Sequence, residues 1–437
     1  MMVSTRRQFI ALVGAAAAAS GFSRLALAQG AEIPQIRIGV VVPARTGSST
    51  VRTSINDYPG QGARMGALIA ESTVGGETQA QGTLLDLLMA NAPTAEAAQR
   101  AAERLVEADE IHALVGGIGE GQAEALSAVA EAAGIPFFNI GSSRDALRGD
   151  ACGRYTFHIE ASAAMYLDAM VARSAAARAR RWYVVAEDNA DGAAMQARAA
   201  EAVQRHGEGG EVVGTAAVAP GQAVYFNEIN AAADAGADCI LLLTGEVDQL
   251  VFLSQYDTAG EAMPVMAFPT VVSQTRDYIA TARYLAPNAN PIERIALWET
   301  TLADAGADAF NTRFMSRWGE PADPTAWAAY HAVKIFADAV WESGSVEGEA
   351  IVSYLESEDA QFDVLKGGAV SFRPWDHQLR QPLYAVGVNQ DGEWDALSLR
   401  DRVDVASHEA TIPAAGDQGT ERLDQFGDGA GAGTCAS

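Results

Sequence analysis

The sequence predicts an α/β protein with two domains, each a parallel sheet covered by helices on both faces. Short apolar or β-branched runs alternate with longer helical segments, and this order begins again after about residue 160. Near-continuous apolar strands are typical of parallel sheets buried on both faces. Because the chain has 437 residues and two successive sets of strand–helix units, we expect two doubly wound domains and not one large sheet.

The first set of units lies within residues 36–140. The run Ile36-Arg37-Ile38-Gly39-Val40-Val41-Val42 is typical of a buried strand, and Pro93-Thr94-Ala95-Glu96 is typical of a helix start. Strands are expected at 36–42, 84–89, 111–115 and 135–140, and helices at 62–72, from 93 onward and at 122–133.

The second set begins with a helix predicted at 163–177. Strands are expected at 182–186, 211–216, 239–243 and 265–268, with helices at 193–205, 226–235 and 247–256 between them. Beyond residue 268 the order is less regular. There we expect a strand at 294–298, an amphipathic helix at 324–341, and a hairpin of 383–388 with 394–397 around Asn389-Gln390-Asp391-Gly392.

The first 28 residues have the pattern of an export signal. Arg6-Arg7 precedes an apolar run at 9–19, and the segment ends in Ala26-Leu27-Ala28, which a signal peptidase accepts. The paired arginines predict the twin-arginine pathway and therefore the periplasm. A disordered basic N-terminus would not explain this ordered pattern. No later stretch approaches the roughly 20 apolar residues of a spanning helix, so no direct membrane insertion is expected.

The net charge restricts the classes of binding partner, and the cysteines indicate where a disulfide can form. The formal net charge of −26 opposes binding to nucleic acids or to acidic lipid surfaces. Cys239 falls in an apolar run and is expected to be a core thiol. Cys152 and Cys435 lie in loop-like sequence, and both a disulfide and two free thiols remain open. The polar, Gly-rich segment 406–437 is expected to be poorly ordered unless Cys435 holds it.

The order of these landmarks over about 36–397 resembles the leucine/isoleucine/valine-type (type I) solute-binding proteins of ABC transporters. Weak apolar-plus-glycine motifs carry the resemblance through their spacing. They are 38–43 (IGVVVP), Gly62-Ala63, 95–107, 114–117 (LVGG), 134–143 (GIPFFNIGSS), 184–192 (VVAEDNADG) and 372–376 (FRPWD).

The resemblance implies a type I periplasmic binding fold in which three crossovers form a hinge between the domains. One domain would use 34–157 and 298–380, and the other 158–297 and 381–405. It further implies capture of a small molecule in the interdomain cleft, delivery to an inner-membrane ABC transporter permease, a monomeric protein and no cofactor. Ligand-driven closure of the hinge is the expected mechanism.

Two loops of the first domain are candidates for the cleft. Gly117-Ile118-Gly119-Glu120-Gly121-Gln122 joins a strand end to a helix start, so Glu120, Gly121 and Gln122 are predicted to meet the ligand. A dinucleotide fingerprint is not complete, because Gln122 replaces its third glycine. Ser142 and Ser143 follow the next strand and have hydroxyls for a carboxylate, although Ser143 is equally suited to cap a helix.

The second domain offers Glu160, Ser162, Asp191 and Glu246, which match ligand-contact positions of the resembled family. Tyr58 is a candidate aromatic wall or a packed neighbour of the first helix. Amino-acid binders of the family place an acidic residue early in the second domain, where this chain has Ala163-Ala164. Glu160 can replace it only by pointing into the cleft. An amino acid, an amide and an organic acid therefore all remain as ligand classes.

Enzymatic function is the main alternative, and we do not expect it. The Gly-x-Ser-x-Gly elbow is absent, and His158, His331 and His377 are isolated in sequence. No Cys/His spacing suggests zinc. The segment 187–192 imitates a calcium loop, but Arg198 occupies its twelfth position. A sensory binding protein that signals to a membrane receptor would share the fold and the cleft. This function therefore remains as an alternative.

Overall fold

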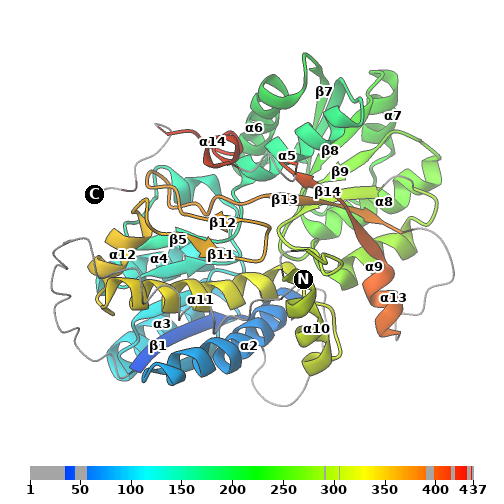
Figure 1. The fold of residues 1–437 in the computed structure, drawn as a ribbon. Coiled ribbons are helices and arrows are strands. Elements are labelled where there is room, and N and C mark those ends of the chain that lie inside the picture. Colours follow the sequence, from blue (N-terminus) through cyan, green and yellow to red (C-terminus); the bar gives the residue numbers. More distant parts are fainter. Residues whose placement is uncertain are drawn as a thin grey trace, which may run out of the picture. The chain divides into compact units, whose positions relative to one another are not determined.

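The computed structural model describes residues 35–44, 57–289, 292–304, 306–389, 398–414, 419–430 and 435. All of them belong to one compact unit that spans Ile33–Ser437. The predicted signal peptide and the predicted strand at 394–397 lie outside the described residues. Within the described part, the helices cover two main sheets, and each sheet with its helices is called here the first or the second half (Figure 1).

The first half contains a parallel sheet of five strands in the order β2-β1-β3-β4-β5. Its strands are β1 (Gln35–Val42), β2 (Leu84–Asn91), β3 (Ala113–Gly116), β4 (Phe137–Asn139) and β5 (Thr156–His158). Its helices are α2 (Tyr58–Ala80), α3 (Ala95–Asp109), α4 (Gln122–Ala133), the 3-10 turn η2 (Asp145–Arg148), and, from later in the chain, α10 (Ala307–Trp318), α11 (Pro324–Ser343) and α12 (Gly348–Leu355). The short strands β11 (Phe362–Asp363) and β12 (Ala369–Val370) pair beside them.

The second half contains a mixed sheet in the order β14-β13-β10-β9-β8-β6-β7. Five of its strands are parallel: β6 (Arg181–Glu187), β7 (Glu211–Val218), β8 (Cys239–Leu243), β9 (Val265–Ala267) and β10 (Ile292–Ala296). Two antiparallel strands, β13 (Leu383–Val388) and β14 (Ala406–Ile412), complete it. Its helices are α5 (Ala163–Ala176), α6 (Ala190–His206), α7 (Phe226–Asp234), α8 (Glu246–Ala259), α9 (Arg276–Leu285), α13 (Leu399–Asp404) and α14 (Thr420–Leu423).

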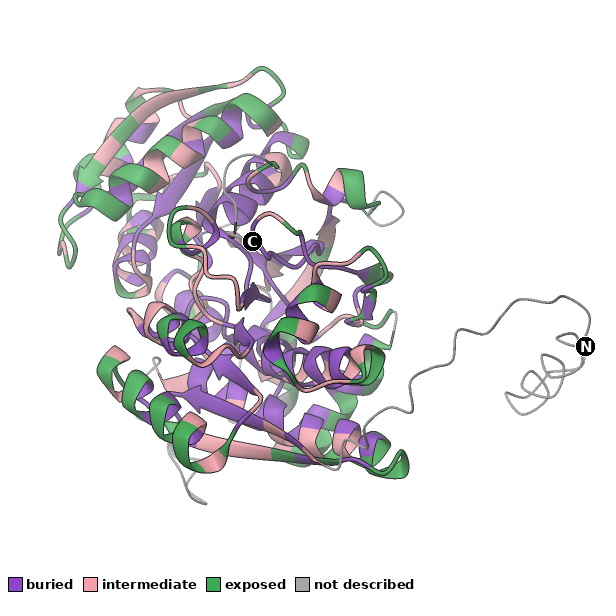
Figure 2. Ribbon diagram, turned by 90° about the vertical axis from the view of Figure 1, so that its left-hand side faces the viewer, coloured by how far each residue is buried: buried purple, intermediate pink, exposed green. Residues whose placement is uncertain are grey.

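Local sequence accounts for most of these elements. Thr94 caps α3, because its side chain accepts a hydrogen bond from the Ala97 amide at 3.3 Å. Every residue of β3, β4 and β8 is buried, as expected for strands covered on both faces. Figure 2 shows strands in the interior as buried and the outer faces of the covering helices as exposed. None of the described helices is long and apolar enough to cross a bilayer.

The end of the chain differs from the sequence prediction. The second strand of the predicted hairpin lies outside the described residues; among those described, β13 pairs with β10 and with β14. The described part of the segment 406–437 supplies the edge strand β14 and the short helix α14, and Cys435 holds it, which is the condition under which the sequence predicts order. The mixed burial of β14 explains why its sequence gave no strand signal. Cys152 and Cys435 form a disulfide, and Cys239 is a buried free thiol.

The chain passes between the two halves three times, after β5, after β10 and after β12. Two buried basic side chains join these crossovers. Arg148 donates to the Glu160 carbonyl and to Gln378 Oε1, both at 2.7 Å. The amino group of Lys366 donates to the carbonyls of Leu297 at 2.6 Å and Pro382 at 3.1 Å. Each side chain thus binds two different crossovers.

Burial changes the acidity of the groups in this cluster. It lowers the pKa of Lys366 well below its ordinary value and lowers the pKa of Arg148 to about 10. Burial also raises the pKa of Glu160 to about 7, although the Tyr166 hydroxyl and Arg148 oppose this. Glu160 Oε1 accepts a hydrogen bond from the Tyr166 hydroxyl, whereas Oε2 has no hydrogen-bond partner among the described residues.

Replacing Lys366 tests its role at the crossovers. Lys366→Met keeps the length of the side chain but leaves three buried acceptors unpaired, Leu297 O, Pro382 O and Gln381 Oε1. We expect the free energy of unfolding in urea to fall by about 2–4 kcal/mol. Lys334→Met is the control, because Lys334 forms a local ion pair with Asp338 one turn away on the same helix. This substitution should lower the free energy of unfolding by about 0.5 kcal/mol or less. Equal losses in the two variants would contradict this role.

The raised pKa of Glu160 predicts a pH dependence of stability. The folded pKa of about 7 exceeds the ordinary value of 4.5, so the protonated carboxyl stabilises the fold fully below pH 4.5. This contribution is lost as the pH rises through 7. Glu160→Gln, which cannot ionise, should therefore gain stability relative to wild type between pH 5 and pH 8 in urea unfolding. Glu349→Gln, at an exposed position, should show no such gain. A stability difference between wild type and Glu160→Gln that stays constant from pH 5 to pH 8 would refute the raised pKa of Glu160.

Candidate functional site

A pocket of about 380 Å³ lies where strand ends of the second half meet the loop after β4. Parallel α/β sheets bind ligands at this edge, outside the carboxyl ends of their strands. The lining residues lie at or after the ends of β4, β6, β8 and β9, at the start of α5, or in the first half of α6. They are Ser143, Arg144, Asp145, Ala146, Ala163, Glu187, Asp191, Gly192, Ala194, Met195, Arg198, Leu243, Thr244, Gly245, Phe268 and Thr270.

Three helices of the second half begin at this pocket, and capping side chains hold the starts of two of them, α5 and α6. Ser162 caps α5 by accepting from the Met165 amide at 3.0 Å, and Asn189 caps α6 by accepting from the Gly192 amide at 2.7 Å. A side chain at Gly192 would collide with the backbone of Glu187, so glycine lets α6 start directly against the end of β6. α8 begins after Gly245.

The carboxylates that line the pocket are all engaged by protein groups. Asp191 pairs with Arg144 at 3.0 Å across the two halves. Asp145 pairs with Arg198 at 3.4 Å and accepts from the Ala164 amide at 3.1 Å. Burial raises the pKa of Asp145, and these two partners oppose the rise.

Glu187, at the end of β6, is engaged as well. Its Oε1 accepts from the Gly245 amide and its Oε2 from the Asn189 side chain, both at 2.9 Å. The Glu187 carboxylate therefore ties the end of β6 to the start of α8 and to the cap of α6. Its contacts assign it a positioning role in the wall of the pocket.

Thr244, in the same wall of the pocket, differs from these carboxylates in its hydrogen bonding. Its hydroxyl is buried and has no hydrogen-bond partner in the part of the chain that the structure describes, and the residue is 4% exposed. A buried hydroxyl without a partner costs about 1–3 kcal/mol, so natural proteins rarely keep one without a function. Phe268, Leu243 and Met195 provide apolar wall beside it. The wall of the pocket thus combines apolar side chains with one buried hydroxyl that has no partner among the described residues.

The structure brings two of the predicted ligand residues, Ser143 and Asp191, into this pocket. Ser142 lies in the same loop, outside the lining, and its hydroxyl accepts from the Arg144 amide at 3.5 Å. The predicted loop of the first half lies elsewhere: Glu120 is exposed, Gly121 precedes α4, and Gln122 is buried and donates to the Ala92 carbonyl.

The other predicted residues also lie outside the lining. The Glu160 carboxylate binds Tyr166 at the crossover, and Ser162 caps α5. Glu246 is the first residue of α8, where its carbonyl accepts from the Tyr278 hydroxyl, and Tyr58 is the first residue of α2.

Sequence reasoning missed Arg144, Arg198, Thr244 and Thr270. A usable signal existed for Thr244, because it directly follows the apolar strand β8. Thr270 likewise comes shortly after β9, and its hydroxyl accepts from the Ser273 amide at 3.1 Å. Arg198 lies two helical turns into α6, where only the fold brings it to the pocket.

A larger cavity of about 620 Å³ lies at the opposite, amino-terminal ends of β8 and β9. Its lining includes Cys239, Met263 and the pair Arg173–Glu293, whose charged atoms are 2.6 Å apart. Because these charges satisfy each other and the cavity lies away from the carboxyl ends of the strands, we place the functional site in the smaller pocket. Among the described residues, no group of three or more His, Cys, Asp or Glu is arranged to hold a metal ion.

The fold and the position of the pocket agree with one protein family. The family model for periplasmic binding proteins matches residues 35–393, which is most of the chain. The chain belongs to the periplasmic binding protein family. The resemblance to its type I members is therefore confirmed, and with it the architecture of two α/β domains joined by three crossovers. Members of this family are solute-binding proteins.

Solved structures show the same fold at low sequence identity. A branched-chain amino acid ABC transporter periplasmic ligand-binding protein from Burkholderia xenovorans LB400 matches with a TM-score of 0.73 at 19% identity, over 86% of this chain and 95% of that one. A leucine-binding protein from Thermotoga maritima MSB8 matches with a TM-score of 0.64 at 13% identity, over 86% and 98%. A solute-binding protein from R. palustris in complex with benzoate matches with a TM-score of 0.67 at 16% identity, over 92% and 99%. No curated protein sequence matches this periplasmic binding protein.

Removing the Thr244 hydroxyl should lower the affinity for ligand without lowering the stability of the protein in the absence of ligand. Thr244→Val preserves the shape of the side chain and removes an unpartnered buried hydroxyl, so the protein without ligand should unfold at the same or a higher urea concentration. Ligand affinity should fall about tenfold, the effect of losing one hydrogen bond of about 1.4 kcal/mol. Thr281→Val on α9, where the hydroxyl bonds Asp277 O within its own helix, is the matched control. A Thr244→Val protein that is clearly less stable without ligand would contradict the absence of a partner.

Proposed function

We propose that this protein captures a small polar ligand between its two halves and delivers it to an inner-membrane ABC transporter permease. The observation that carries the proposal is the pocket at the carboxyl ends of β6, β8 and β9, closed on its other side by Ser143 and Arg144 of the loop after β4. A ligand there would touch both halves. Membership of the periplasmic binding protein family supports the same function.

The chemistry of the pocket favours an amide or an organic acid over an amino acid. An α-ammonium group requires an available carboxylate, but Asp145, Asp191 and Glu187 already have protein partners. The buried Thr244 hydroxyl suits a carbonyl or carboxylate oxygen, and Phe268 and Leu243 suit an apolar body. An amino acid and an organic acid both appear in the names of similar structures, since one is called a leucine-binding protein and another is in complex with benzoate.

Ligand capture is proposed to close the protein about its three crossovers. The moving bodies would be residues 34–157 with 298–380 and residues 158–297 with 381–405. A ligand stabilises the closed form only by binding it more tightly than the open form. The Arg144–Asp191 pair supports this mechanism, because it joins the two halves at the edge of the pocket and can form only when they are close.

The sequence and the family support the proposed location and partner. The twin-arginine pattern in residues 1–28 supports export to the periplasm, where the closed form would meet the permease. The strongly negative chain supports neither nucleic-acid binding nor adsorption to acidic lipid. We propose that the protein works as a monomer.

A thermal-shift screen tests the proposed function and its ligand class. The purified protein should be tested against amino acids, their amides, aliphatic acids and aromatic acids, with benzoate and leucine as named members. At a concentration about 100-fold above Kd, a true ligand stabilises the fold by about 2.7 kcal/mol. We expect the largest shifts from amides or organic acids, and smaller shifts in Thr244→Val at the same concentration. The absence of a shift with every class would contradict the function, and a preference for α-amino acids would contradict the ligand class.

A further inference from the structure

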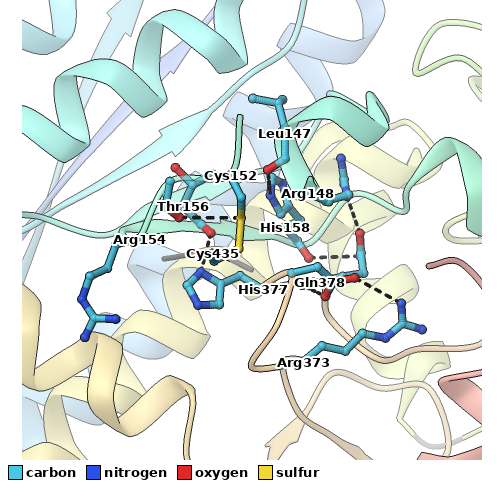
Figure 3. The surroundings of a disulfide bond; sticks show 12 residues. Leu147, Arg148, Cys152, Arg154, Thr156, His158, Arg373, His377, Gln378 and Cys435 are labelled. Atoms are coloured by element: carbon cyan, nitrogen blue, oxygen red, sulfur yellow. Dashed lines mark hydrogen bonds and ion pairs between the residues drawn. A yellow bond between two sulfur atoms is a disulfide. The ribbon is translucent and has the colours of Figure 1, made fainter. Parts of the chain in front are cut away.

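The C-terminal end of the chain crosses from the second half to the first. We call its described residues, 419–430 and 435, the C-terminal strap. The strap follows β14, the edge strand of the second sheet, and ends at Cys435. Cys435 is bonded to Cys152, which lies between η2 and β5 of the first half (Figure 3). The matched family region ends at residue 393, so the strap lies beyond it.

The strap binds the second half through α5 and α6. The Gly427 amide donates to the buried Asp168 carboxylate at 2.7 Å, and Arg205 donates to the Gly427 carbonyl at 2.8 Å. Gly427 has a φ of +92°, and a side chain there would collide with Met165. The Phe426 ring stacks on His206 with the ring centres 5.0 Å apart. This part of the strap is therefore fixed to helices of the second half.

The strap also binds the third crossover and the segment before it. Buried Arg373 donates to the carbonyls of Phe426 at 2.6 Å and Leu423 at 2.9 Å. Asp424 accepts from both Arg373, at 3.0 Å, and Arg380, at 2.8 Å. The Cys435 amide donates to the Trp375 carbonyl at 3.0 Å. The strap is thus held on both sides of the region where the halves meet.

One strap residue reaches a side chain of the ligand pocket. Asp428 pairs with Arg198 at 2.6 Å, and Arg198 lines the pocket and pairs there with Asp145. Separation of the two halves would have to lengthen the strap or break these contacts. The disulfide fixes Cys435 to the first half, and the contacts of residues 424–428 with the second half would oppose separation.

We propose that the C-terminal strap is a fourth connection between the two halves, which limits how far they separate when the pocket is empty. Its covalent anchor is the Cys152–Cys435 disulfide, and Asp428 transmits its position to the pocket through Arg198. Ligand exchange then depends on the strap. This last statement rests on the proposed ligand-binding function, whereas the limit on separation does not.

Small-angle scattering without any ligand tests the limit directly. Oxidised wild type should be compared with wild type treated with dithiothreitol, which converts the disulfide to two thiols as the reagent is oxidised, and with the double variant Cys152→Ser/Cys435→Ser. We expect the radius of gyration to increase in both, and to return when the reduced wild type is reoxidised. Circular dichroism establishes that the secondary structure is retained. Superposable scattering curves for the oxidised and reduced wild type would overturn the proposal.

Asp428→Asn tests the strap with its disulfide intact. This substitution removes the ion pair with Arg198 and should increase hydrogen exchange at the crossover amides of His158 and Leu379, which donate across neighbouring crossovers. Glu421→Gln, at an exposed position of α14, is the control and should leave this exchange unchanged. Equal exchange in Asp428→Asn and the control would remove Asp428 from the proposal. None of these readouts uses a ligand, so a failed ligand screen would leave the test of the strap unaffected.

Discussion

Buried basic side chains at the crossovers are the constraint on which the rest of the structure depends. Lys366 and Arg148 are both removed from water, which costs free energy unless their N–H groups have acceptors. Carbonyl oxygens of crossover segments meet this requirement: Leu297 and Pro382 for Lys366, and Glu160 for Arg148. The geometry of the crossovers follows from it, and the crossovers decide how the strand ends of one half face the loops of the other.

The pocket is a consequence of that arrangement. Strand ends at Glu187, Leu243 and Phe268 come from one sheet, and the loop with Ser143 closes over them from the other. The acidic residues in the wall hold the helix starts and the neighbouring arginines, so they build the pocket. The Thr244 hydroxyl differs from them, because it is buried without a hydrogen-bond partner among the described residues.

The C-terminal strap adds a second means of controlling the same geometry. In the proposed arrangement the strap connects α5 and α6 with Cys152, and it also binds Arg373 and Arg380 at the third crossover. Through Arg198 the strap and the pocket also share one side chain, so the two cannot move independently.

The sequence by itself predicted the two sets of strand–helix units, an export signal and the family, because strand burial, helix capping and the spacing of landmarks are local properties. It located Ser143 and Asp191 for the same reason, since both follow strand ends. Only the tertiary structure decided that Glu160 belongs to the crossover cluster, that β13 pairs with β14, and that Arg198 joins the pocket to Asp428. These depend on which segments distant in sequence become neighbours and lose their contact with water, and no local pattern of residues encodes that.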